Sequence, residues 1–166
     1  GATVINIAVD GKLAGILAIA DPVKPSTPEA LKALAAEGIK VIMLTGDNAV
    51  VARAVCNRLG LTEHFADMLP AYKASVIQEL QRQGRRVAMV GDGINDSPAL
   101  SFADVGIAMK HGAEVTHESA DVILMEDSLW KLVKAVEISQ GAVQLIKQNY
   151  GIVAALSWGL AEFLDR

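Results

Sequence analysis

Short apolar segments alternate with longer amphipathic segments through the middle of this sequence, and this alternation limits its possible folds more than any other feature. Strand-length apolar runs occur at residues 39–44, 65–69, 86–90, 105–109 and 122–125. The helix-length runs between them end at Gly38, Gly60 and Gly84, and glycine is the usual residue just past a helix. Strands separated by such helices favour a parallel sheet covered on both faces. The sequence therefore predicts an α/β, Rossmann-like doubly wound domain over residues 21–140.

Two further segments flank this predicted domain. Apolar runs at Thr3–Val9 and 12–20 surround Asp10-Gly11, which predicts a β-hairpin over residues 1–20. Two prolines in 21–25 stiffen the connection that follows, and we place a domain boundary there. Ser26 with Glu29 has the pattern of a capping box for the first helix.

A helical pattern begins near Leu129 and predicts a long C-terminal helix. From Gln148 to Ala161 the chain carries no charge, although a bilayer-spanning helix needs about 20 apolar residues. Residues 141–166 are therefore expected to form either a buried terminal helix or the first turns of a spanning helix.

Charge and cysteine content exclude some classes of function. The formal net charge is −4 and no long basic run is present, which argues against a nucleic-acid-binding surface. The single cysteine, Cys56, lies on an apolar helical face and is expected to be a buried structural thiol. One cysteine cannot form an internal disulfide, which fits a reducing compartment.

The segment Gly91-Asp92-Gly93-Ile94-Asn95-Asp96 carries the strongest chemical pattern. Asp92 directly follows a predicted strand and Asp96 enters a helix, so the two carboxylates can converge on one cation. Mg²⁺ favours one or two carboxylates together with phosphate oxygens and water. The alternative is a simple turn with an N-capping aspartate, since Asp-Gly and Asn-Asp are common in turns.

A second polar loop, Thr45-Gly46-Asp47-Asn48, also follows a predicted strand and precedes a helix. A hydroxyl and an exposed glycine N–H in this position form an anion-binding arrangement. The alternative is an ordinary helix cap by Asp47 or Asn48. Lys73 follows Pro70 at a helix start and could offset phosphate charge, or could be a solvated surface lysine. Because ligands bind at the carboxyl ends of parallel strands, we expect both loops at one edge of the sheet.

In order and spacing, Thr45-Gly46-Asp47, Lys73 and the 91–96 segment resemble the second half of the phosphorylation domain of P-type ATPases. These pumps belong to the haloacid-dehalogenase-like superfamily. The segments 21–25, 97–100, 103–109 and 118–122 are also similar to the family. Their sequences most resemble those of its heavy-metal-transporting subgroup. The resemblance covers nearly the whole chain.

The resemblance implies roles for individual residues. Thr45 and Gly46 would hold phosphoryl oxygens, and Lys73 would neutralise charge that develops on the phosphoryl group. Asp92 would bind Mg²⁺ directly, with Asp96 and Asn95 completing the phosphate and metal surroundings. Asp47 belongs to the same catalytic motif. The implied cofactors are Mg²⁺ and, in the complete protein, ATP.

The resemblance also implies missing parts. The family's phosphorylated aspartate lies in an Asp-Lys-Thr-Gly-Thr segment, and no aspartate here has that context. We therefore expect a fragment of an ATP-driven heavy-metal pump, with residues 1–20 as the tail of the nucleotide domain and 141–166 leading into a membrane segment. In the full-length membrane protein this part would lie on the cytoplasmic face. Two alternatives are a stand-alone binding or regulatory module and a soluble phosphatase. The missing strand should leave a sheet edge or gap that invites self-association.

Overall fold

The computed structural model describes residues 3–9, 12–19, 23–91, 94–110, 118–126 and 128–164. Asp92 and Gly93 of the predicted metal-binding segment lie outside the described residues, as does the Asp10-Gly11 turn. The chain divides into two compact units, residues 1–131 and 132–166.

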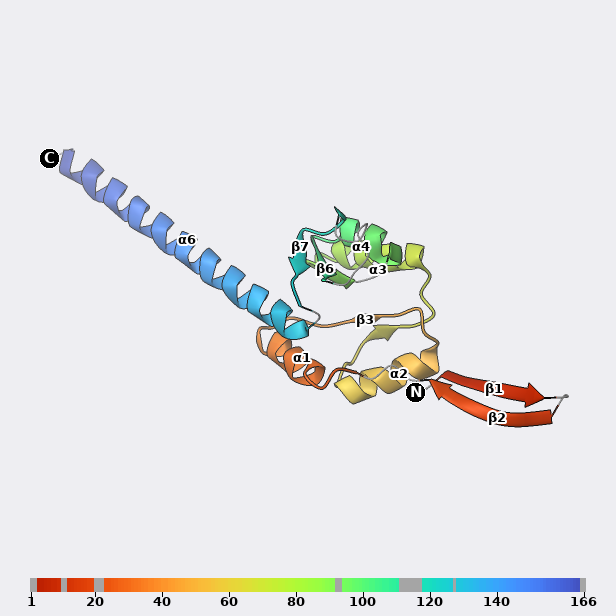
Figure 1. Ribbon diagram of the computed structural model, residues 1–166. Helices are drawn as coiled ribbons and strands as arrows, with labels where there is room; N and C mark the ends of the chain where they lie inside the picture. The colour runs from red at the N-terminus through yellow and green to blue at the C-terminus, as the bar shows by residue number, and fades with distance from the viewer. Residues whose placement is uncertain are drawn as a thin grey trace. The chain divides into compact units, whose positions relative to one another are not determined.

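The N-terminal hairpin is confirmed. Strand β1 (Thr3–Val9) pairs antiparallel with β2 (Lys12–Ile19) from Thr3↔Ile19 to Val9↔Lys12 (Figure 1). The register shifts between Ile7 and Ala8, so the ladder contains one irregularity.

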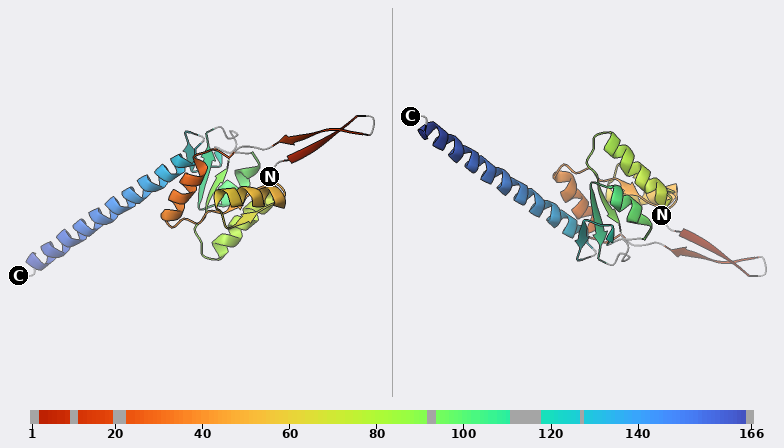
Figure 2. Two further views of the ribbon diagram at one scale, coloured as in Figure 1. Left: turned by 90° about the horizontal axis from the view of Figure 1, so that it is seen from below. Right: turned by 90° about the horizontal axis from the view of Figure 1, so that it is seen from above.

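The rest of the first unit is built from short parallel strands and helices, and the predicted α/β class is confirmed (Figures 1 and 2). Its strands are β3 (Met43–Leu44), β4 (His64–Phe65), β5 (Ala88–Gly91), β6 (Val105–Met109) and β7 (Val122–Leu124). Its helices are α1 (Thr27–Ala36), α2 (Ala49–Leu59), α3 (Pro70–Arg82), the 3-10 helix η1 (Ile94–Asp96) and α4 (Ser97–Phe102). Among the described residues β3 pairs with β4, and β5, β6 and β7 form a second ladder, all parallel. The expected interruption of the sheet is therefore present between these ladders.

Local sequence explains where the helices begin and end. The Asn48 side chain accepts hydrogen bonds from the amides of Val50 and Val51, and so caps α2. Gly60 ends α2 in a left-handed conformation with φ of 69°, which glycine adopts without steric cost.

The capping box predicted for α1 is wrong, because the hydrogen bond to its capping side chain is not formed. Ser26 is the N-cap residue, but its φ and ψ of −77° and −13° are helical and its side chain makes no capping bond. The chain enters α1 through a turn in which the Thr27 amide donates to the carbonyl of Lys24 (3.0 Å). A capping hydroxyl normally needs an extended backbone at the N-cap residue, which this turn does not provide.

Four strands are shorter than or displaced from the predicted ranges, although for 122–125 only Met125 is lost. Residues 39–44 contribute only Met43–Leu44, residues 65–69 contribute only Phe65 to His64–Phe65, and 86–90 becomes Ala88–Gly91. For β3 and β4 the pairing partner sets the length, because these two strands share only two register positions. The apolar runs alone therefore overestimate the number of residues that pair in the strands.

A small core brings the end of β3 next to β5. Ile77 of α3, Met89 of β5 and Leu100 of α4 form a buried cluster with Ala99. Leu44, the last residue of β3, packs against this cluster. The two polar loops that follow β3 and β5 therefore begin close to one shared core.

The predicted C-terminal helix is confirmed as a single helix, α6 (Leu129–Leu164), which provides the second unit from Leu132 onward (Figure 1). Its side chains from Glu137 to Ser157 are exposed. No helix among the described residues is long and apolar enough to cross a membrane.

Candidate phosphate-handling site

The loop after β3 holds its threonine and aspartate together. Thr45 Oγ1 donates a hydrogen bond to Asp47 Oδ2 (2.9 Å) and accepts one from the Asp47 amide (3.1 Å). Asn48, rather than Asp47, caps α2. The helix-capping alternative thus accounts for Asn48 and leaves Thr45, Gly46 and Asp47 as an exposed or half-buried polar loop at a strand end.

The segment after β4 holds this loop from the other side. The Thr45 amide donates to the Phe65 carbonyl (3.0 Å), and the Met68 amide returns a bond to the Thr45 carbonyl (3.0 Å). The Asp67 amide donates to the Asp47 carbonyl (2.8 Å). A Cβ at Gly46 would lie 3.6 Å from the Met68 carbonyl oxygen, so this backbone passes in ordinary contact.

Lys73 is paired rather than solvated. Its Nζ lies 2.7 Å from Asp96 Oδ1, and the two side chains are only 16% and 10% exposed. Asp96 is also packed against β5, since a Cβ at Gly91 would lie 2.7 Å from the Asp96 Cβ. The absence of a side chain at Gly91 is what lets Asp96 occupy this position. The structure therefore joins Lys73 and Asp96, which are 23 positions apart along the chain, into one charged pair.

The remaining residues of the 91–96 segment are distributed differently. Asn95 is exposed and contributes to η1. Asp92, the predicted direct magnesium ligand, lies outside the described residues. Next to Asp96, the Ser97 Oγ is buried and has no hydrogen-bond partner among the described residues, an unusual state for a hydroxyl.

The oxygen donors present are suited to a hard cation and a phosphate. A carboxylate and a hydroxyl are the ligand types that Mg²⁺ prefers, usually alongside phosphate oxygens and water. Asp96 Oδ1 is already bonded to Lys73, which fits an accessory position better than a direct one. Among the described residues there is no cluster of three or more His, Cys, Asp or Glu side chains arranged to hold a metal ion.

Two groups with displaced pKa values lie outside the motif segments. The Asp104 carboxylate accepts a hydrogen bond from the Val87 amide (2.8 Å), and that bond, with further ones from Gln81 and Arg86, lowers its pKa. Burial raises the pKa of the Cys56 thiol, which confirms the predicted buried cysteine. Asp104 ties the start of β5 to the end of α4, and so supports the strand that leads into the site.

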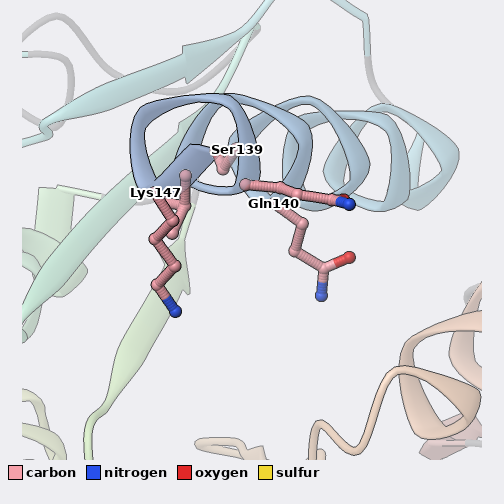
Figure 3. Close-up of a pocket in the computed structure, with 5 residues that line it drawn as sticks. Ser139, Gln140 and Lys147 are labelled. Atoms are coloured by element: carbon pink, nitrogen blue, oxygen red, sulfur yellow. The ribbon is translucent and has the colours of Figure 1, made fainter. Parts of the chain in front are cut away.

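Two surface hollows among the described residues lie away from the polar loops. One is lined by Gln78, Gln81 and Arg82 of α3. Another runs along α6, where Ser139, Gln140 and Lys147 belong to the same helix (Figure 3). Each is lined by a single helix, so neither provides groups converging from several elements.

Sequence reasoning missed one residue of this site, Asp67. It has φ of 53° and is the only non-glycine residue with positive φ among the described residues. The prediction of a strand over residues 65–69 hid it, because a left-handed residue does not continue a strand. The usable pattern was an aspartate three residues before Pro70, where α3 begins, since Asp tolerates this conformation better than most residues.

Comparison with known proteins defines the class. Residues 2–104 match the family model of haloacid dehalogenase-like hydrolases, and the chain belongs to this family. Within it, the relatives are heavy-metal P-type ATPases. The chain is 52% identical over 149 residues to the silver exporting P-type ATPase of Salmonella typhimurium, and 45% identical over 160 residues to copper-transporting ATPase 2 of Mus musculus. A crystal structure of a zinc-transporting PIB-type ATPase in the E2.Pi state matches with a TM-score of 0.81 at 39% identity.

These matches cover most of this chain but little of each relative. The alignments span 90% of this chain and 18% of the silver exporter, and 96% of this chain and 11% of the mouse copper transporter. The zinc transporter is matched over 90% of this chain and 24% of its own. The chain therefore corresponds to the haloacid dehalogenase-like region of much longer pumps.

Proposed function

We propose that this chain supplies the phosphate- and magnesium-handling side of an aspartyl-phosphate site in an ATP-driven heavy-metal pump. The observation that carries the proposal is the largely buried Lys73–Asp96 pair, whose members lie 23 positions apart in sequence. A lysine held in place at low exposure is suited to phosphoryl transfer, where positioning and charge stabilisation do most of the catalytic work.

We assign roles to the motif residues on this basis. Gly46, with no side chain, allows an anion to approach its N–H, and Thr45 turns its hydroxyl from Asp47 to a phosphoryl oxygen. Asp47 then no longer receives the Thr45 hydrogen bond, while Asn95 is exposed and able to contact the same anion. Lys73, oriented by Asp96, offsets the negative charge. Asp92 and Asp96 would hold Mg²⁺, which supplies charge neutralisation on the phosphate.

The complete protein would add the parts that this role requires. These are the phosphorylated aspartate, the rest of a nucleotide domain that binds ATP, and membrane helices that select the metal. This region would then lie on the cytoplasmic face, with residues 1–20 at the end of the nucleotide domain, 21–140 in the phosphorylation domain and 141–166 leading toward the membrane. Free strand edges in the isolated chain would favour self-association.

Hydrolysis of acetyl phosphate with Mg²⁺ tests this proposal, with Asp92→Ala as the matched variant. We expect a folded chain with no turnover, because the aspartate that would accept the phosphoryl group is missing. Turnover that disappears in Asp92→Ala would instead favour a soluble phosphatase that uses another nucleophile.

A binding or regulatory module is the second candidate, favoured by the missing nucleophile. It predicts that Asp92→Ala leaves binding of a partner intact while it abolishes any effect of Mg²⁺ on the melting temperature. Loss of both effects together would count against a separate binding role.

A further inference from the structure

The phosphate-handling loop and the helix that carries Lys73 are joined through one residue in an unusual backbone conformation. Asp67 has φ of 53°, in the left-handed region that non-glycine residues rarely adopt. It lies between β4, which ends at Phe65, and α3, which begins at Pro70. A conformation of this kind persists only where the surrounding structure fixes it, and such residues cluster at functional sites.

The surrounding bonds show what the left-handed turn does. It directs the Asp67 amide to the Asp47 carbonyl (2.8 Å) and the Met68 amide to the Thr45 carbonyl (3.0 Å). Two consecutive N–H groups therefore hold both ends of the Thr45–Asp47 loop. An extended backbone at residue 67 would turn successive N–H groups to opposite sides and would lose one of these bonds.

The same short segment also fixes the start of α3. The Tyr72 amide donates to the Leu69 carbonyl (2.9 Å), which forms the first turn of the helix. Lys73 follows in this turn and is held at its far end by Asp96. The path from Thr45 through Met68 and Leu69 to Lys73 thus consists of backbone bonds and a few residues of chain.

The side chain of Asp67 has no visible part in this arrangement. It is exposed, and no hydrogen bond to its carboxylate occurs among the described residues. The contribution of Asp67 is therefore made by its backbone conformation.

We propose that Asp67 is a positioning residue, whose left-handed backbone sets the distance between the Thr45–Asp47 loop and Lys73 so that both contact one phosphate. This inference rests on the proposed phosphate-handling function. It adds a residue that does not touch the phosphate itself and acts by positioning the residues that do.

Three substitutions separate backbone from side chain. Asp67→Gly and Asp67→Asn both tolerate the left-handed region, and Asp67→Asn also removes the charge. Asp67→Val is strained there because its side chain is β-branched. Orthophosphate affinity is measured for each full chain by NMR titration with Mg²⁺ at an ionic strength held constant with potassium chloride. We expect Asp67→Gly and Asp67→Asn to remain within about threefold of the original chain and Asp67→Val to be weaker by about tenfold, a ratio equal to about 1.4 kcal/mol.

A role confined to stability gives a different pattern. In that case Asp67→Val lowers the melting temperature but the folded fraction binds phosphate with unchanged affinity, and the inference is wrong. Asp67→Asn as weak as Asp67→Val also overturns it, because the carboxylate would then be responsible. Should Asp67→Val not fold, Asp67→Ala applies a smaller strain and must show a smaller loss in the same direction.

A second measurement keeps this inference separate from the proposed function. Amide hydrogen exchange at Asp67 and Met68 reports the two loop bonds without any ligand. Slow exchange in the original chain and in Asp67→Gly, with fast exchange in Asp67→Val, supports the backbone link between the loop and α3. This holds even if the chain binds no phosphate, because a lack of phosphate binding would contradict only the proposed function. Fast exchange at both amides in the original chain overturns the inference.

Discussion

Breaking the Lys73–Asp96 pair should cost far more stability than breaking a surface pair of the same sequence separation. The Nζ to Oδ1 distance is 2.7 Å, which corresponds to a gross attraction of about 6 kcal/mol at an effective dielectric constant of about 20. Removing water from both groups offsets much of this attraction. With side chains 16% and 10% exposed, the loss should fall between the values for exposed and fully buried pairs, at about 2–3 kcal/mol for each single variant.

The assay is a double-mutant cycle of Lys73→Met and Asp96→Asn. Urea unfolding is followed through NMR signals of Ile77 and Leu100, which report the core cluster of the first unit. We expect the double variant to be more stable than the sum of the single losses predicts, by about 2 kcal/mol, because neither charge is left unpaired.

Lys40 and Glu63 provide the matched control. This pair has the same separation in sequence as Lys73 and Asp96, but its side chains are 47% and 45% exposed. The cycle of Lys40→Met and Glu63→Gln should give a coupling below about 1 kcal/mol. Equal coupling energies in the two cycles would refute the argument that burial makes the Lys73–Asp96 pair special.

Three further predictions concern residues around the site. Ser97→Ala should leave stability unchanged or raise it by about 1 kcal/mol in urea unfolding, because it removes a buried hydroxyl that has no partner in the described part of the chain; a clear loss would mean that the hydroxyl is bonded. Gly106→Ala should destabilise the chain by about 1–3 kcal/mol, since its Cβ would lie 2.8 Å from the backbone oxygen of Leu100; an unchanged unfolding midpoint would contradict this close contact. Asp104 has a pKa below its ordinary 3.8, so its stabilisation is present above that pH and is lost as the pH falls through the lowered value. The difference in urea midpoint between the original chain and Asp104→Asn should therefore be largest near neutral pH and should disappear in strong acid. A difference that does not change with pH would argue against the Asp104 hydrogen bonds.

The elements that could be predicted from the sequence are those fixed by local patterns. The hairpin around Asp10-Gly11 and the helix stops at Gly38, Gly60 and Gly84 depend on neighbouring residues alone. Strand lengths were harder to predict. The lengths of β3 and β4 depend on the residues that these two strands pair with, and not on their own apolar runs. The capping bond of Ser26 failed for a similar reason, since the preceding turn sets its backbone.

The site was predictable in its residue types but not in its contacts. The motifs marked Thr45, Lys73 and Asp96, yet the sequence could not show that Lys73 pairs with Asp96, because that contact depends on the packing of α3 against η1. The sequence likewise could not show that Gly91 leaves room for the Asp96 side chain. Asp67 acts through its backbone, and backbone conformation leaves little trace in composition.

The most direct test of the central claim is to map phosphate binding on the chain itself. Orthophosphate is added with Mg²⁺ at constant ionic strength, and every backbone amide is followed by NMR. We expect the amides of six residues to shift together with a single dissociation constant: Thr45, Gly46, Asp47, Lys73, Asn95 and Asp96. Shifts that concentrate elsewhere, or that separate the Thr45 loop from Lys73 and Asp96, would contradict the claim that these motifs form one phosphate-handling site.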